Sequence, residues 1–212
     1  MKPILFNTEM VRAILDGRKT VTRRVIRWDK VDNALSCPYR RKNIEIPDDK
    51  IIERLCGAPY CMADILYVRE TWTILPGTPG DNFRPSGVYY YKADGDMRPD
   101  RFRDNGWHPS IHMPKEAARI FLRVQDVHDV HVERVQEITG AECVREGIPQ
   151  ESLKEVGEAF TVGQFADLWD STVKPSDRAL YGWDANPWVW VIDFERISRD
   201  EATRGEINVP TN

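Results

Sequence analysis

The unbroken apolar runs of this chain are short, and their length limits what it can fold into. The clearest examples are residues 65–68 and 188–192, in a chain of 212 residues. A helix that crosses a bilayer needs about 20 consecutive apolar residues, whereas a buried strand needs about five. The runs therefore predict buried strands, and we expect no membrane partner.

Composition narrows the class of protein further. With 41% hydrophobic and 30% charged residues, the chain can build a core and does not resemble a disordered segment. Its 30 basic and 34 acidic residues nearly cancel, so net charge supplies no general attraction to nucleic acid, although a local basic groove is compatible with it. Residues 1–7 lack the apolar stretch and cleavage site of a secretory signal. We expect a cytoplasmic protein.

Four cysteines, at positions 37, 56, 61 and 143, are too few and too irregularly spaced for a disulfide framework. Cys37, Cys56 and Cys61 together with a histidine would make a zinc site, but their spacing is not that of a zinc knuckle. The alternative is a set of buried or incidental thiols. We favour that alternative and expect neither a metal nor another cofactor.

Strand-forming segments at irregular spacing, with short helices between them, predict an α+β fold with a small barrel. The expected strands cover residues 19–26, 64–72, 87–93, two segments within 117–135 that meet at a kink near 126–129, and 188–197. Residues 28–62 and 73–114 lack a regular period and contain much Pro and Gly, so we expect two long loop insertions there. We predict a single domain over residues 1–200 and a C-terminal tail over 201–212.

Two segments carry the Ser/Thr-x-x-Glu pattern of a helix capping box, residues 139–142 and 152–155. The first predicts a helix that ends at Gly147, which places Glu146 in the last turn. The second predicts helical material that carries Phe165, Leu168 and Trp169, and we expect the glycines at 157 and 163 to break it into pieces. A further amphipathic helix is expected near the N-terminus, over residues 8–16.

Residues 14–24, Ile-Leu-Asp-Gly-Arg-Lys-Thr-Val-Thr-Arg-Arg, resemble the signature of the ASCH domain superfamily. The motif of that group is a glycine and basic residues followed by Lys, Thr and Arg at close spacing. Residues 68–72, 109–114 and 182–191 are similar to the longer phage and prophage ASCH-domain proteins. The resemblance covers most of the chain and implies a PUA-like β-barrel.

One small bacterial ASCH protein is an amidohydrolase that removes the acetyl group from N4-acetylcytidine with a Lys, a Thr three residues later and a distant Glu. The resemblance places the lysine at Lys19 and the threonine at Thr22, and an alignment on the helix cap at Thr139 places the glutamate at Glu146. It implies a metal-independent amidohydrolase that acts on an N4-acylated cytidine or a related modified pyrimidine nucleoside. The expected partner is a small nucleoside or modified base, with RNA as an alternative.

Amide hydrolysis needs an activated nucleophile and a base. Thr22 would supply the hydroxyl, and a neutral Lys19 amine would accept its proton if burial or a cation such as Arg24 lowers the lysine pKa. On a regular strand, residues three apart point to opposite faces. Either Lys19 lies in an irregular turn after Gly17, or a bulge redirects one of the two side chains. Glu146 could orient the lysine, hold the substrate amine or relay a proton.

Aromatic and polar residues of the motif-bearing segments could recognise a base, because aromatic rings stack on nucleobases and polar groups bind their edges. The alternative for each aromatic residue is packing in the core. The candidate substrate-binding residues are Arg24, Arg69, Glu70, Trp72, Ser110, His112, Trp183 and Asn186.

Three other functions stay open at this point. One is a non-catalytic protein that binds RNA or a modified base, and another is a ribonuclease of phage origin in which Lys19 and Arg24 stabilise the phosphate. No histidine pair suited to acid–base catalysis by a ribonuclease is evident. The third is a structural role in a virion. Salt-dependent affinity for oligonucleotides would favour the nucleic-acid binder.

Overall fold

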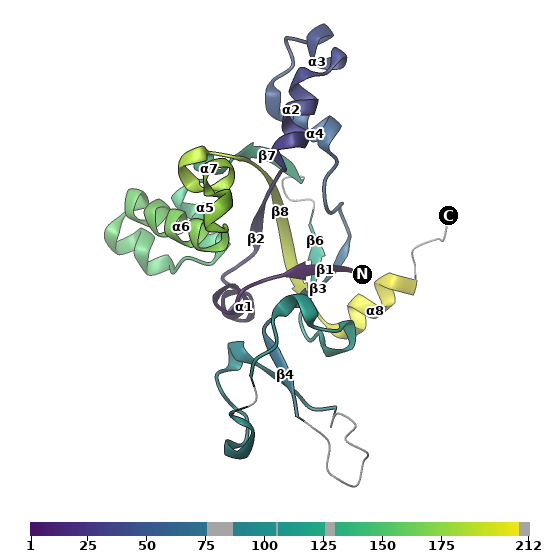
Figure 1. Ribbon diagram of the computed structural model, residues 1–212, viewed down its shortest axis with the longest axis vertical. Helices are drawn as coiled ribbons and strands as arrows, with labels where there is room; N and C mark the ends of the chain where they lie inside the picture. The colour runs from purple at the N-terminus through teal and green to yellow at the C-terminus, as the bar shows by residue number, and fades with distance from the viewer. Residues whose placement is uncertain (76–86, 105, 126–129, 208–212) are drawn as a thin grey trace. The chain divides into compact units, whose positions relative to one another are not determined.

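A computed structural model describes residues 1–75, 87–104, 106–125 and 130–207 (Figure 1). Helices and strands are mixed along the chain, so the fold class is α+β, as expected. No helix within these residues is long and apolar enough to span a bilayer. The chain forms two compact units: the first consists of Met1–Gly17, Asp64–Arg123 and Arg196–Asn212, and the second of Arg18–Ala63 and Val124–Glu195.

The strands of the first unit belong to two sheets. Strand β1 (Lys2–Leu5) runs parallel to β3 (Ile65–Arg69), which is antiparallel to β6 (Phe121–Val124). Strand β4 (Trp72–Ile74) pairs antiparallel with β5 (Tyr89–Tyr91) in a separate two-stranded sheet. The strand expected over 64–72 is therefore divided between two sheets.

Two helices complete the first unit. Helix α1 (Thr8–Leu15) begins where the Asn7 side chain accepts a hydrogen bond from the backbone N–H of Met10 at 2.8 Å. Helix α8 (Arg199–Ile207) occupies much of the segment expected to be a C-terminal tail. Ala202 is fully buried and anchors this helix, whereas residues 208–212 lie outside the described part of the chain.

The sheet of the second unit is centred on β8 (Trp188–Ile197), which matches the strand expected there. Strand β2 (Val21–Val25) pairs antiparallel with residues 189–193 of β8, and β7 (His131–Arg134) pairs antiparallel with the overlapping residues 188–191. Because one stretch of β8 pairs with both, β2 and β7 lie at its opposite edges. The expected kink at 126–129 lies outside the described residues.

Helices α5 (Gly140–Glu146), α6 (Glu158–Thr172) and α7 (Arg178–Tyr181) group together beside β2 and β8 (Figure 1). Apolar side chains of these strands and helices form one core, so the helices cover one face of the sheet. The buried members of this core are Val21, Val135, Ile138, Cys143, Ile148, Phe165, Trp169, Val189 and Val191.

The two predicted capping boxes have different outcomes. The first forms: the Thr139 side chain accepts the backbone N–H of Glu142, and the Glu142 carboxylate accepts the N–H of Thr139 at 2.9 Å. Gly147 then ends α5 with a left-handed φ of 113°. The second capping box does not form: Ser152–Val156 is a π-helical turn without a side-chain cap. The break expected at Gly157 is present, with a φ of 95°, whereas α6 runs through Gly163 without the second expected break.

The expectation of a loop over residues 28–62 was also wrong. This segment contains α2 (Trp28–Ser36), α3 (Pro38–Lys42) and α4 (Asp48–Cys56), which lie together in Figure 1. Each helix is short and buries few side chains, which leaves a weak periodic signal in the sequence. Within the other expected insertion, residues 76–86 lie outside the described residues. The buried side chains of α2 and α4 are Val31, Ala34, Ile51, Ile52 and Cys56.

Two glycines of the second unit should respond oppositely to alanine. Gly147 has a φ of 113°, which strains any side chain, so Gly147→Ala should lower the free energy of unfolding by about 1 kcal/mol. Gly163 lies inside α6, where an added Cβ meets no atom within 4 Å. Gly163→Ala should therefore raise the free energy of unfolding by about 0.5–1 kcal/mol. Urea denaturation measures both. Changes of the same sign would contradict this backbone geometry.

Candidate active site

Lys19 lies just before the strand that carries the rest of its motif. Gly17 has a φ of 75°, and residues 18–20 have no regular secondary structure before β2 begins at Val21. Of the two arrangements considered from the sequence, the structure has the first, an irregular segment after the glycine. The Lys19 ammonium donates a hydrogen bond to the backbone oxygen of Val21 at 2.9 Å.

The same ammonium is bound to the end of α5. Lys19 Nζ donates to the backbone oxygen of Glu146 at 2.9 Å and forms a short ion pair with the Glu146 carboxylate. The side chains are 0% and 3% exposed, respectively. A lysine ammonium has three donors, and the protein engages each of them here. Two of the three residues expected to act together are therefore in direct contact.

Arg23 completes this buried group of charges. Its guanidinium donates to the second oxygen of Glu146 at 3.3 Å, and pairs with Glu133 at 2.7 Å and with Glu142 at 3.2 Å. The Arg23 side chain is 0% exposed, so it depends on these carboxylates for its stability inside the protein. We call Lys19, Arg23, Glu133, Glu142 and Glu146 the buried charge cluster.

Sequence reasoning missed three members of the buried charge cluster. Arg23 alternates with Val21 and Val25 on β2, and an arginine on a buried apolar face needs carboxylates around it. Glu142 precedes Glu146 by four residues and therefore lies on the same face of α5. The arginine on the apolar face of β2 and the four-residue spacing of the two glutamates were the sequence signals for this cluster.

The environment of Lys19 favours its neutral form more than water does. Burial lowers the pKa of Lys19, the Glu146 carboxylate opposes this shift, and the guanidinium groups of Arg24 and Arg23 lower the pKa further. The net result is a pKa below the ordinary lysine value. A neutral amine, which general-base chemistry requires, is thus more accessible here than at an exposed lysine.

Thr22 is buried but does not bond to the pair. It is 3% exposed and lies opposite Ile192 in the β2–β8 ladder. Within the described part of the chain, its hydroxyl has no hydrogen-bond partner. Because strand side chains alternate, Thr22 points to the face of β2 opposite to Arg23. Its hydroxyl is therefore available for another group, while Lys19 and Glu146 are engaged with each other.

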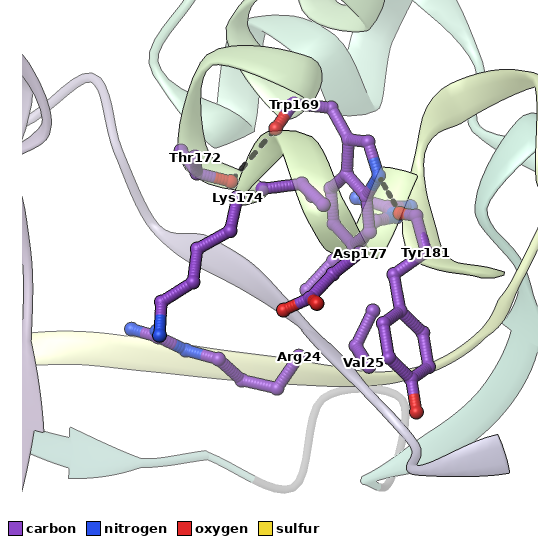
Figure 2. A pocket seen from close by; sticks show the side chains of 9 residues that line it. Arg24, Val25, Trp169, Thr172, Lys174, Asp177 and Tyr181 are labelled. Atoms are coloured by element: carbon purple, nitrogen blue, oxygen red, sulfur yellow. Dashed lines mark hydrogen bonds between the residues drawn. The ribbon is translucent and has the colours of Figure 1, made fainter. Parts of the chain in front are cut away.

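Arg24 lies two residues beyond Thr22, on the same face of β2, and is half-buried. It borders a pocket of about 320 Å³ (Figure 2). Burial lowers the pKa of Arg24, although a guanidinium stays charged at ordinary pH. The other lining residues are Arg23, Val25, Trp169, Thr172, Val173, Lys174, Asp177 and Tyr181.

The other two candidates of the second unit, Trp183 and Asn186, brace the chain before β8. Trp183 packs edge-on against Phe165, with ring centroids 6.1 Å apart. Asn186 has a left-handed φ of 45°, and its side-chain oxygen accepts the backbone N–H of Gln136 at 3.1 Å. Neither residue lines the pocket that Arg24 borders.

The remaining candidates belong to the first unit. Glu70 is 1% exposed, and its carboxylate accepts two hydrogen bonds from Arg119, at 2.9 and 3.0 Å. Burial raises the pKa of Glu70, while Arg119 opposes the shift. Arg119 also bonds to Asp94 and lies over the ring of Tyr91. Trp72 is buried in the core of this unit.

Arg69 supports a neighbouring segment of the first unit. Its Nε donates to the backbone oxygen of Met113 at 2.9 Å, and its guanidinium also bonds to the backbone oxygen of Ile111. Ser110 and His112 lie in the helical turn that these bonds hold in place. Arg69 thus has a visible structural role.

The cysteines considered as zinc ligands have separate environments. The Cys37 sulfur accepts the backbone N–H of Arg40 at 3.4 Å, and the buried Cys56 thiol donates to the backbone oxygen of Lys30 at 3.6 Å. Among residues with described positions, no three His, Cys, Asp or Glu side chains are grouped to hold a metal ion.

Comparisons of the chain with protein-family models, with curated proteins and with solved structures find no match. What the protein does is therefore inferred from its residues and their geometry. The buried charge cluster and the pocket beside Arg24 are the two features on which that inference rests.

The buried charge cluster predicts unequal effects for its two central residues. Glu146→Gln leaves Lys19 without its carboxylate and should lower the free energy of unfolding by about 3–5 kcal/mol. Lys19→Met should lower the free energy of unfolding by less, because the Glu146 carboxylate still pairs with Arg23. The double variant should lower it by less than the sum of the two single changes. Urea denaturation measures all three, with the exposed Glu151→Gln as control. An effect of Glu146→Gln no larger than the control would refute this role.

The lowered pKa of Lys19 predicts a pH dependence. On unfolding, this pKa returns to its ordinary value of 10.5, so between the two values the unfolded chain binds the additional proton. The free energy of unfolding of the wild type should therefore rise relative to Lys19→Met as the pH increases from neutrality towards 10.5, and then level off. Urea titrations at several pH values test this. A falling difference would mean that Glu146 outweighs burial.

Proposed function

We propose that the protein is a metal-independent amidohydrolase that removes an acyl group from N4 of cytidine or of a related modified pyrimidine nucleoside. The observation that carries the proposal is the buried pair of Lys19 and Glu146, close in sequence to the unengaged hydroxyl of Thr22. Buried ion pairs are often no more stabilising than apolar residues of similar size. A lysine with a perturbed pKa beside a carboxylate is instead a common feature of catalytic sites.

In this proposal Thr22 is the nucleophile and Lys19 is the base. The proton shared by Lys19 and Glu146 moves to Glu146, which leaves a neutral amine. Because Thr22 faces away from Arg23 and its Glu146 partner, this step requires the Lys19 amine to leave Glu146 and turn to the Thr22 hydroxyl. The Thr22 oxygen then attacks the acyl carbon while its proton passes to Lys19, and Lys19 protonates N4 as the C–N bond breaks. Water hydrolyses the acyl-threonine ester and releases the carboxylic acid. Arg24, on the same face of β2 as Thr22, would stabilise the oxyanion.

The size and lining of the pocket beside Arg24 suit a small ligand. Its volume of about 320 Å³ lies within the range of roughly 300–1,000 Å³ that is usual for small-molecule sites. Trp169 and Tyr181 contribute aromatic walls, which suit a flat base. A PUA-like barrel, the fold that the ASCH resemblance implies, belongs to the same proposal.

A second candidate function is a non-catalytic protein that binds a modified base or RNA. The observation that favours it is that Lys19 and Glu146 already have partners within the buried charge cluster. Lys19 donates to Glu146, and Arg23 donates to the second oxygen of the Glu146 carboxylate. Such a cluster also stabilises the contact between α5 and β2 without any role in catalysis. In a binder, loss of the Thr22 hydroxyl would leave ligand affinity nearly unchanged.

Turnover separates the two candidates. The wild type should release cytidine from N4-acetylcytidine, and Thr22→Val, which keeps the side-chain shape, should lower the rate by about 10³-fold or more. Thr22→Ser should keep part of the activity, and Thr20→Val serves as a neighbouring control. Chromatography of the products measures release. Absence of turnover across a panel of acylated nucleosides, together with retained binding, would replace the hydrolase by the binder.

A further inference from the structure

Strand β2 has one edge that pairs with β8 and one edge that does not pair. Within the described part of the chain, β8 is the only partner of β2, which lies at the end of its sheet. The backbone N–H of Phe194 donates to the Thr20 oxygen, and that of Ile26 donates to the Trp188 oxygen, each at 2.9 Å. Because such bonds alternate along an antiparallel ladder, the even-numbered residues direct their backbone groups at β8.

The odd-numbered residues of β2 direct their backbone groups away from β8. Val21, Arg23 and Val25 occupy the non-hydrogen-bonded pairs of the ladder, so their N–H and C=O groups point out from the sheet edge. Lys19 agrees with this geometry, because its ammonium binds the Val21 oxygen at 2.9 Å from outside the ladder. For Arg23 and Val25, no described residue supplies a hydrogen-bond partner to the outward groups.

The pocket drawn in Figure 2 lies against this unpaired edge. Arg23, Arg24 and Val25 all line it, although the Arg24 side chain points to one face of the sheet and the other two point to the opposite face. A pocket that touches both faces of one strand reaches the backbone at the strand's edge. Arg23 is 5% exposed, and buried backbone groups are nearly always paired with protein, water or a ligand.

The aromatic walls of the pocket offer flat surfaces whose polar groups are already engaged. The Trp169 indole N–H donates to the backbone oxygen of Tyr181 at 2.8 Å, and the Tyr181 hydroxyl accepts the backbone N–H of Trp28 at 3.1 Å. Val25 packs against the core that contains Trp169, which places this core beside the strand edge. The unpaired edge therefore supplies the neutral, directional hydrogen bonds that these walls lack.

The free stretch of the edge is too short to add a strand from a peptide. On one side Lys19 occupies the Val21 oxygen, and on the other side the chain enters α2 at Trp28. Two outward-facing residues remain between these limits. An added strand gains its affinity from several successive main-chain bonds, whereas a small planar molecule needs one adjacent donor and acceptor. The pocket volume of about 320 Å³ also suits a small molecule.

We propose that the backbone N–H and C=O of Val25 bind the N3 and N4 edge of a cytosine base, which stacks on the aromatic wall formed by Trp169. The identity of the base rests on the proposed function. When the acyl group of an N4-acylcytidine turns towards C5, N3 accepts a hydrogen bond and N4–H donates one from the same edge of the ring. The Val25 N–H donates to N3, and N4–H donates to the Val25 oxygen. The pocket thus selects pyrimidines that keep a free N3 and a hydrogen on N4.

Calorimetric titration of the full-length protein with cytidine and with N4,N4-dimethylcytidine tests the proposal. The wild type should bind the dimethylated nucleoside about tenfold more weakly or worse, because one methyl group lies beside N3 and blocks both bonds to Val25. Val25→Pro removes the outward N–H and no ladder bond, a change that an edge strand accepts. This variant should bind cytidine about tenfold more weakly than the wild type and bind the dimethylated nucleoside with little change.

Val25→Ala is the matched variant, because it shortens the same side chain and keeps the backbone N–H. It should weaken cytidine binding by less than Val25→Pro does. Equal effects of the two variants on cytidine, or equal affinity of the wild type for the two nucleosides, would overturn the proposal. Circular dichroism checks that both variants fold, and the two nucleosides still decide the question on the wild type if Val25→Pro does not.

Hydrolysis distinguishes this proposal from the proposed function. If the protein hydrolyses N4-acetylcytidine and the two Val25 variants have the same KM, the amidohydrolase stands and the edge site is refuted. If the protein hydrolyses no acylated nucleoside but binds cytidine more weakly after Val25→Pro than after Val25→Ala, the edge site stands and the amidohydrolase is refuted.

Discussion

The second unit depends on one carboxylate placed between two buried cations. One oxygen of the Glu146 carboxylate binds Lys19 and the other binds Arg23. Burial costs each cation several kcal/mol of hydration free energy, and the contact with Glu146 offsets this cost. The arrangement requires the end of α5 to meet the start of β2 at a fixed point. A backbone hydrogen bond from Thr20 to Arg145, at 2.8 Å, holds the two segments there.

Local rules of helix formation determine that meeting point. The Thr139 cap sets the first turn of α5, and the left-handed Gly147 sets its last. If the helix continued through Gly147, the following backbone would turn in another direction, and the Gly147 carbonyl could not accept its hydrogen bond from Arg18. A pair of residues 127 positions apart thus becomes a contact through signals that each act over a few residues.

Those local signals also explain which features the sequence predicts. Helix α5 and strand β8 were predicted because each carries its own cap or its own run of β-branched and aromatic residues. Helices α2 and α4 were missed because each has few buried positions, and these positions become buried only when the helices pack together. For the candidate site, Lys19 and Glu146 came from a resemblance. Arg23 was recognisable in principle, since it interrupts a buried apolar face, whereas Lys174 and Asp177 follow α6 in a segment that no local pattern places beside β2.

The neighbours Arg23 and Arg24 show how strand alternation divides charge within this unit. Arg23 turns towards α5, where three carboxylates neutralise it, and its side chain has no exposed surface. Arg24 turns to the opposite face and borders a pocket that it shares with Lys174. The two neighbouring arginines therefore show a separation between a fully buried, neutralised guanidinium and one that borders a pocket. Because that separation follows from a period of two, moving β2 by one residue would exchange the two arginines and remove both features.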